Sequence, residues 1–208
     1  MYRLVIFDFD GTLADSLGWL AGEVRPLARR FGFREVSDVE IDMLRGRGNR
    51  EILRYLNVPA WKLPAIAAHL RRRVAEDAEA IRLFPGAKAL LRRLAGDGVI
   101  LGVVSSNAEA NVKRILGPEA AALIGYYECG ASIFGKAARF RRMVKRAGVA
   151  PGDVLCVGDE ARDIEAARDA GLASAAVTWG YATRDLLAAR RPTWMFDSPD
   201  ACAAKLAA

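Results

Sequence analysis

Three short apolar segments of this chain, ending at Phe7, Val104 and Val157, are each followed by side chains that could perform chemistry. These side chains are Asp8 and Asp10 after the first segment, Ser105, Ser106 and Asn107 after the second, and Asp159 after the third. If the segments are parallel strands, their carboxyl ends meet at one edge of a sheet, where such sheets bind ligands. Grouped carboxylates repel one another unless a cation lies among them, and hard oxygen ligands suit Mg²⁺. The pattern therefore predicts a magnesium site at this edge.

Two further charged residues fall on the apolar faces of predicted helices. Lys136 shares a face with Phe140 and Val144, because these positions recur at the helical period of about 3.6 residues. A lysine at the start of an apolar stripe is expected to reach the strand ends. Asp163 begins a similar face on the helix that follows Asp159. We expect Asp163 either to join the site or to interact with the dipole of its own helix.

Strand-like and helical patterns alternate along the chain, which predicts an α/β fold: a Rossmann-like, mostly parallel sheet with helices on both faces. The predicted strands cover residues 4–7, 100–104, 126–129, 154–157 and 175–177, with an edge strand at 194–196. Residues 16–84 show helical patterns and no convincing strand. We therefore expect a catalytic core formed by residues 1–14 and 85–208, with an inserted, all-helical cap formed by residues 15–84.

Within the predicted cap, we expect one helix over residues 49–56, capped by Asn49, and a second over residues 59–80. Residues 45–49, Arg-Gly-Arg-Gly-Asn, place two glycines between basic and amide side chains. This composition suits a loop that approaches an anion, so Arg45 is a candidate substrate contact. The alternative is an ordinary connection between helices with solvated arginines.

The composition is typical of a folded globular protein. The chain has 208 residues, of which 52% are apolar and 27% charged, enough to bury a sizeable core. No apolar run reaches the about 20 residues that span a bilayer, and the N-terminus leads directly into an acidic strand end, unlike a signal peptide. Three cysteines without metal-type spacing argue against a disulfide scaffold or a structural zinc site. We therefore expect a cytoplasmic protein that binds no membrane.

The formal net charge of +6 suggests an anionic partner. Residues 15–84 contain 13 basic and 10 acidic residues, and the remainder contains 18 and 15, so the excess marks no dedicated basic surface. Only six of the 31 basic residues are lysines, which makes Lys136 stand out. We expect the charge to attract small phosphorylated metabolites weakly, and we expect no nucleic-acid partner.

Four motifs of this chain resemble those of the haloacid dehalogenase superfamily. Residues 8–16 (DFDGTLADS) resemble its first motif, and residues 103–107 (VVSSN) resemble its second. Lys136 resembles the third motif, and residues 158–163 (GDEARD) resemble the fourth. The helical stretch after the first motif resembles the cap of the phosphoglycolate phosphatase-like branch.

The resemblance implies a role for each motif residue. Asp8 would be the nucleophile that forms an aspartyl phosphate, and Asp10 would be the general acid and then the general base. Mg²⁺ would be held by Asp8, the Asp10 carbonyl and Asp159. Lys136 would offset negative charge, and Asp163 would be a further metal-site acid or would orient the lysine. The implied phosphate-binding residues are Gly11, Thr12, Ser105, Ser106 and Asn107.

Asp10 discriminates between branches, because the dehalogenases of this superfamily lack the second acid. The resemblance therefore implies a Mg²⁺-dependent phosphatase that acts on a small phosphorylated metabolite, with phosphoglycolate as the nearest family substrate. A phosphomutase shares all four motifs and stays open as an alternative. A protein whose site has been repurposed for binding or regulation also stays open. We expect a monomer or a weak homodimer.

Overall fold

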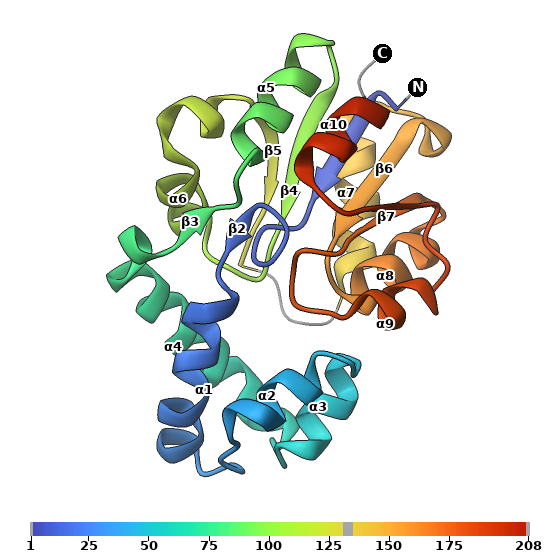
Figure 1. Cartoon of the computed structure of the whole chain (residues 1–208). Helices are drawn as coiled ribbons and strands as arrows, with labels where there is room; N and C mark the ends of the chain where they lie inside the picture. Colours follow the sequence, from blue (N-terminus) through green and yellow to red (C-terminus); the bar gives the residue numbers. More distant parts are fainter. Residues whose placement is uncertain (1, 131–134, 207–208) are drawn as a thin grey trace.

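The computed structural model describes residues 2–130 and 135–206, and these are organised around one six-stranded sheet (Figure 1). Its strands are β1 (Leu4–Phe7), β4 (Ile100–Val104), β5 (Ile124–Glu128), β6 (Val154–Gly158), β7 (Ala173–Val177) and β8 (Trp194–Phe196). They lie in the order β5-β4-β1-β6-β7-β8, and every neighbouring pair is parallel. The expected α/β fold is therefore confirmed. The strand order reverses at β1, and such a reversal is where parallel sheets bind ligands.

Strand β1 shows why helices must cover both faces of the sheet. All four of its residues are fully buried, and successive side chains point to opposite faces. Val5 and Phe7 belong to one apolar cluster with α5, α6 and α10, whereas Leu4 and Ile6 pack with α7 and α8. These helices are α5 (Ala87–Gly96), α6 (Glu109–Ala122), α7 (Lys136–Ala147), α8 (Ala161–Ala170) and α10 (Pro199–Leu206), with α9 (Arg184–Ala188) beside α8. A strand held on both sides gives the residues that follow it a rigid support.

The first four helices of the chain, which precede α5, stand apart from the sheet, beyond the carboxyl ends of its strands (Figure 1). They are α1 (Leu17–Phe31), α2 (Asp38–Leu44), α3 (Asn49–Tyr55) and α4 (Leu63–Glu76), and we call them the helical insertion. Two short strands, β2 (Ala14–Asp15) and β3 (Arg82–Leu83), pair antiparallel at its base. Strand β3 shows that the expectation of no strand in residues 16–84 is wrong. Two residues are too few to show the alternation by which a strand is recognised in a sequence.

Two helix boundaries of the insertion also differ from the prediction. Asn49 is the first residue of α3 and not its cap, since Gly48 occupies the cap position, where its amide donates to the Glu51 carboxylate at 3.0 Å. The helix expected over residues 59–80 is divided into a 3₁₀ turn, α4 and a second 3₁₀ turn, and α4 begins where proline fits the first helical turn. Neither these helices nor any other in the described residues is long and apolar enough to cross a membrane.

Candidate active site

The adjacent carboxyl ends of β1, β4 and β6 bring three of the predicted polar residues together. Asp8 follows β1, Ser105 follows β4, and Asp159 follows β6. All three are buried, and Asp159 is completely so. Asp163 joins them from the first turn of α8 and is buried as well. The order of the strands in the sheet therefore assembles residues that are far apart in the sequence.

Asp8, Asp159 and Asp163 form a compact acidic cluster. Each offers a carboxylate oxygen, and these oxygens lie within 4.8 Å of one another. Burial raises the pKa of Asp8 to about 7 despite the opposing charge of Lys136. Burial, together with the charge of Glu160, raises the pKa of Asp159 well above its usual range. Buried carboxylates at this spacing are costly without a cation, and a set of hard oxygen donors fits Mg²⁺.

Lys136 brings positive charge to the acidic cluster. Its Nζ lies 2.9 Å from Asp8 Oδ2 and donates a hydrogen bond to Asp163 Oδ1 at 2.6 Å. Burial by itself would lower the pKa of this lysine, but the charges of Asp163 and Asp8 outweigh burial and the pKa is raised. Lys136 is the first residue of α7, on the face that carries Phe140 and Val144 into the core. The lysine therefore stays protonated and holds two carboxylates in place.

Asp10 lines a cavity next to the acidic cluster. Its two carboxylate oxygens accept hydrogen bonds from Ser16 Oγ at 3.3 Å and from Ser105 Oγ at 3.4 Å. Ser16 Oγ lies in turn 2.7 Å from Tyr181 Oη. Burial raises the pKa of Asp10. A carboxyl group with a raised pKa beside a cavity is suited to donating and accepting protons.

The loop after β1 and the loop after β7 both close around Asp159. Thr12 Oγ1 donates to Asp159 Oδ1 at 2.8 Å, and the Tyr181 amide donates to Oδ2 at 2.7 Å. Gly11 has a φ of +79°, and a Cβ there would lie 2.2 Å from Asp159 Oδ2. A Cβ at Gly180 would lie 2.3 Å from the Gly11 carbonyl oxygen. The structure thus places the Thr12 hydroxyl, which was predicted to bind phosphate, on a carboxylate of the cluster.

Ser106 and Asn107, the other predicted phosphate-binding residues, both line the cavity. Asn107 is buried, and its Oδ1 accepts hydrogen bonds from the Ala108 amide at 2.9 Å and from Asn111 Nδ2 at 3.0 Å. The backbone amide of Asn107 donates to Ser105 Oγ at 3.0 Å. Asn107 therefore holds the shape of the loop, whereas Ser106 is partly exposed where a ligand would lie.

Arg45 and Asn49 connect the helical insertion to the loops of the sheet. Arg45 donates from Nε to the Tyr181 carbonyl at 3.0 Å and from Nη2 to the Gly180 carbonyl at 3.3 Å. Asn49 Nδ2 donates to Glu160 Oε2 at 2.8 Å. Arg45, which was predicted to contact substrate, thus uses these two donors to bind backbone carbonyls of the loop after β7. Both residues hold the insertion over the strand ends.

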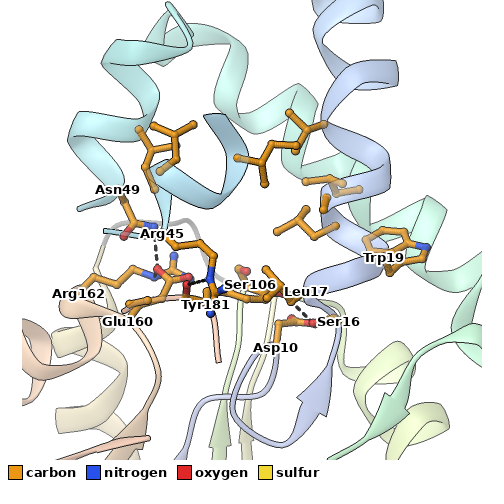
Figure 2. Close-up of a pocket in the computed structure, with 18 of the residues that line it drawn as sticks. Asp10, Ser16, Leu17, Trp19, Arg45, Asn49, Ser106, Glu160, Arg162 and Tyr181 are labelled. Atoms are coloured by element: carbon orange, nitrogen blue, oxygen red, sulfur yellow. Dashed lines mark hydrogen bonds and ion pairs between the residues drawn. The ribbon is translucent and has the colours of Figure 1, made fainter. Parts of the chain in front are cut away.

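The cavity between the helical insertion and the strand ends has a volume of about 340 Å³. Figure 2 shows Asp10, Ser106, Glu160 and Arg162 along its sheet side, facing side chains of the insertion. A ligand held at the acidic cluster would extend past Asp10 into this space.

Tyr181 and Arg162 belong to the site but carry no catalytic signal of their own in the sequence. Arg162 Nε lies 2.7 Å from Glu160 Oε2, so the acid that directly follows Asp159 in the sequence has a charged partner. Tyr181 lies in the loop after β7, the strand next to β6. The same rule that drew attention to the other strand ends could have pointed to this loop.

Known proteins resemble this chain over most of its length. The family model described as haloacid dehalogenase-like hydrolase matches residues 5–177. The phosphoglycolate phosphatase of Synechococcus elongatus is 35% identical over 198 residues, which cover 95% of this chain and 93% of that protein. The phosphoglycolate phosphatase of Xanthomonas campestris is 30% identical over 195 residues, which cover 88% and 86%. The crystal structure of a predicted phosphoglycolate phosphatase from Haemophilus somnus is 26% identical, has a TM-score of 0.74, and the match covers 95% of each chain. This chain belongs to the haloacid dehalogenase-like hydrolase family.

Proposed function

We propose that this protein is a Mg²⁺-dependent phosphatase that hydrolyses a small phosphomonoester, with phosphoglycolate as the reference substrate. The observation that carries the proposal is the buried cluster of Asp8, Asp159 and Asp163 around Lys136, with Asp10 beside it in the cavity wall. The names of the two phosphoglycolate phosphatases support the choice of substrate class. We further propose that residues 15–84 form a cap over a catalytic core of residues 1–14 and 85–208.

In the first step of the proposed mechanism, the Asp8 carboxylate attacks phosphorus. A bond forms between the Asp8 oxygen and phosphorus, the bond to the leaving oxygen breaks, and Asp10 gives its proton to that oxygen. Lys136 at 2.9 Å favours the ionised form of Asp8 that attacks. The raised pKa of Asp10 supports its role as the acid.

In the second step, water attacks the phosphorus of the aspartyl phosphate. Asp10 accepts a proton from this water, the bond between phosphorus and Asp8 breaks, and inorganic phosphate leaves. The Ser105 hydroxyl and the Ser106 amide would face the phosphoryl oxygens, and Lys136 would offset their charge. The Gly11 amide, which was also predicted to face phosphate, donates instead to the Ala14 carbonyl oxygen at 2.8 Å. Ser105 is buried at the end of β4, and Lys136 is held by Asp8 and Asp163, so both groups stay in place through both steps.

The residues of the acidic cluster fit a divalent cation. Asp8, the Asp10 carbonyl and Asp159 would hold it. Asp163 Oδ1 accepts a hydrogen bond from Lys136 Nζ at 2.6 Å, and this direct contact favours a role of Asp163 in orienting the lysine. Bound Mg²⁺ supplies the positive charge that allows an anionic carboxylate to approach an anionic phosphate ester.

A cytoplasmic location and a monomer or weak homodimer complete the proposal. Cys129, Cys156 and Cys202 are all free thiols, which suits a reducing compartment. Burial raises the pKa of the Cys202 thiol to about 12, so it is unreactive. Light scattering of the purified protein tests the oligomeric state, and a stable larger assembly would contradict it.

Phosphate release from a panel of phosphorylated metabolites, phosphoglycolate included, tests the function. We expect release with Mg²⁺ and a loss of about a thousand-fold or more in Asp8→Asn, as for other catalytic nucleophiles. Asp38→Asn, a change at an exposed carboxylate of the insertion, is the matched control. Product analysis with a hexose phosphate separates a phosphatase from a phosphomutase, which would return the phosphoryl group to the sugar. No release from any compound of the panel contradicts the proposal.

A further inference from the structure

We infer that the leaving group of the substrate carries an apolar portion larger than the two-carbon glycolyl group, and that the helical insertion binds this portion in the cavity. The inference rests on the proposed phosphatase function and names its substrate class. That class is the phosphomonoesters of alcohols that carry an apolar alkyl chain or ring.

The two sides of the cavity differ in chemistry. The sheet side is polar and begins at Asp10, next to the acidic cluster. The side formed by the insertion is apolar, and all four of its helices contribute, with Leu20 and Val24 from α1, Ile41 from α2, Ile52 from α3, and Ile66 and Leu70 from α4. Figure 2 shows side chains of the insertion facing the polar side chains of the sheet side across the open space. A substrate that spans the cavity must therefore be anionic at one end and apolar at the other.

The apolar side of the cavity is not the filled core of a helix bundle. Of the apolar insertion residues that line it, Val36, Leu44 and Val74 are buried, and the others are partly exposed. The described residues contain three clusters of buried apolar side chains, and none of these clusters includes a residue of α2 or α3. Packed protein interiors leave few voids larger than a water molecule. A cavity of about 340 Å³ walled by partly exposed apolar side chains is instead typical of a ligand site.

The charges around the cavity do not favour a second anionic group in its apolar part. Arg45 and Arg71 donate hydrogen bonds to backbone carbonyls of the sheet loops. Arg162 lies against Glu160, and Arg47 is exposed to solvent. Arg45, Arg71 and Arg162 therefore lie at the polar end of the cavity, beside the position proposed for phosphate. A glycolyl group would leave most of the cavity unfilled and would gain nothing from its apolar wall.

The test uses the full chain with Mg²⁺ and a series of alkyl phosphates, from ethyl through butyl to hexyl and cyclohexylmethyl phosphate. The leaving alcohols have similar acidity, so differences in kcat/KM report binding of the alkyl group and not its chemical reactivity. We expect kcat/KM to rise by about tenfold or more from ethyl to hexyl phosphate, since one methylene in an apolar pocket can change kcat/KM about tenfold. We also expect hexyl phosphate to exceed phosphoglycolate.

A matched pair of variants on α4 locates the effect. Ala67 lines the cavity, whereas Ala68 is exposed and does not. Ala67→Phe is expected to lower the ratio of kcat/KM for hexyl over ethyl phosphate by about tenfold. Ala68→Phe makes the same change on the outer face and is expected to leave both values as in the wild type.

A binding measurement on the wild type keeps the inference testable if Ala67→Phe does not fold. Calorimetry should show that hexylphosphonate binds with a more negative heat-capacity change than methylphosphonate, because apolar surface is buried. Equal heat-capacity changes, or a kcat/KM for phosphoglycolate above that of every alkyl phosphate, would overturn the inference and leave the phosphatase function intact. If neither phosphoglycolate nor any alkyl phosphate is hydrolysed, the proposed function is wrong and the inference falls with it.

Discussion

The hydroxyl oxygen of Tyr181 lies 2.7 Å from Ser16 Oγ, and this contact extends to Asp10, whose Oδ1 lies 3.3 Å from the same serine oxygen. The Tyr181 amide also donates to Asp159 Oδ2 at 2.7 Å. Tyr181 therefore contacts the partner of the proposed general acid through its side chain and a proposed metal ligand through its backbone. A residue of the loop after β7 thus helps to position groups that come from β1 and β6.

Tyr181→Phe removes the hydroxyl group and keeps the ring. We expect Asp10 to be less well oriented, which lowers kcat for alkyl phosphates about fivefold, the effect of about 1 kcal/mol from one neutral hydrogen bond. KM should change little. The loss should be much smaller for p-nitrophenyl phosphate, because its leaving group needs no proton from Asp10. Steady-state kinetics with both substrates measure this difference. Tyr126→Phe, which removes a hydroxyl group from β5 at the edge of the sheet, is the control.

An equal loss of kcat for both substrates in Tyr181→Phe would show a general structural effect and contradict a role in positioning the acid.

Gly180→Ala should disturb the site through a clash that cannot relax. The added Cβ would lie 2.3 Å from both Asp159 Cβ and the Gly11 carbonyl oxygen, and neither atom is the end of a flexible side chain. We expect the free energy of unfolding to fall by about 1–3 kcal/mol and phosphate release to drop with it. Urea denaturation measures the first effect. Gly152→Ala, where a Cβ meets nothing within 4 Å, should leave stability nearly unchanged, and a similar loss in both variants would refute the explanation.

Mg²⁺ should raise the thermal stability of the protein, because a cation relieves the repulsion among the buried carboxylates of the acidic cluster. At about 100 times its Kd, a ligand that binds only the folded state contributes about 2.7 kcal/mol. For a chain of this size that corresponds to a rise in Tm of about 5–10 °C. Calorimetric scans with Mg²⁺ and with a chelator measure the rise.

Asp159→Asn should greatly reduce the Mg²⁺-dependent rise in Tm, whereas the exposed change Asp38→Asn should retain it. A full rise in Asp159→Asn would place the cation elsewhere.

Glu128 at the end of β5 should stabilise the fold in a pH-dependent way. Its carboxylate accepts hydrogen bonds from Arg142 Nε at 2.9 Å and from Arg146 Nη1 at 3.1 Å, and Arg142 holds the pKa of Glu128 below its ordinary value of 4.5. Because the pKa is lower in the folded state, the stabilisation is present above about pH 4.5 and is lost as the pH falls through the folded-state pKa. We expect Glu128→Gln to lower the free energy of unfolding by about 2 kcal/mol near neutral pH.

The difference between Glu128→Gln and the wild type should shrink in acid, where the wild-type carboxyl group is protonated too. Urea denaturation at neutral and acid pH measures this difference. Glu79→Gln changes a side chain that is 90% exposed and should have little effect at either pH. A Glu128→Gln difference that stays constant down to strong acid would contradict the assignment.

Much of the fold and the acids of the site could be predicted because their signals are local. A strand such as β1 is a short apolar run in the sequence, and the acids that follow it stand directly at its end. Lys136 could be assigned to the inner face of α7 because three side chains share that face at the helical period. Strand β3 was missed because two residues carry no such period, and the role of Asn49 was missed because its partner, Glu160, is 111 residues away.

The sequence by itself therefore determined the parallel sheet, the acids at its strand ends and the lysine that faces them. Only the tertiary structure decided which donors remain for a ligand, since Thr12 and Arg45 suit phosphate chemically but contact Asp159 and backbone carbonyls. It also decided that Tyr181 meets Ser16 across 165 residues of chain. The cavity, too, could be found only in the tertiary structure. Periodicity shows which face of a helix is apolar but not whether that face meets another helix or open space.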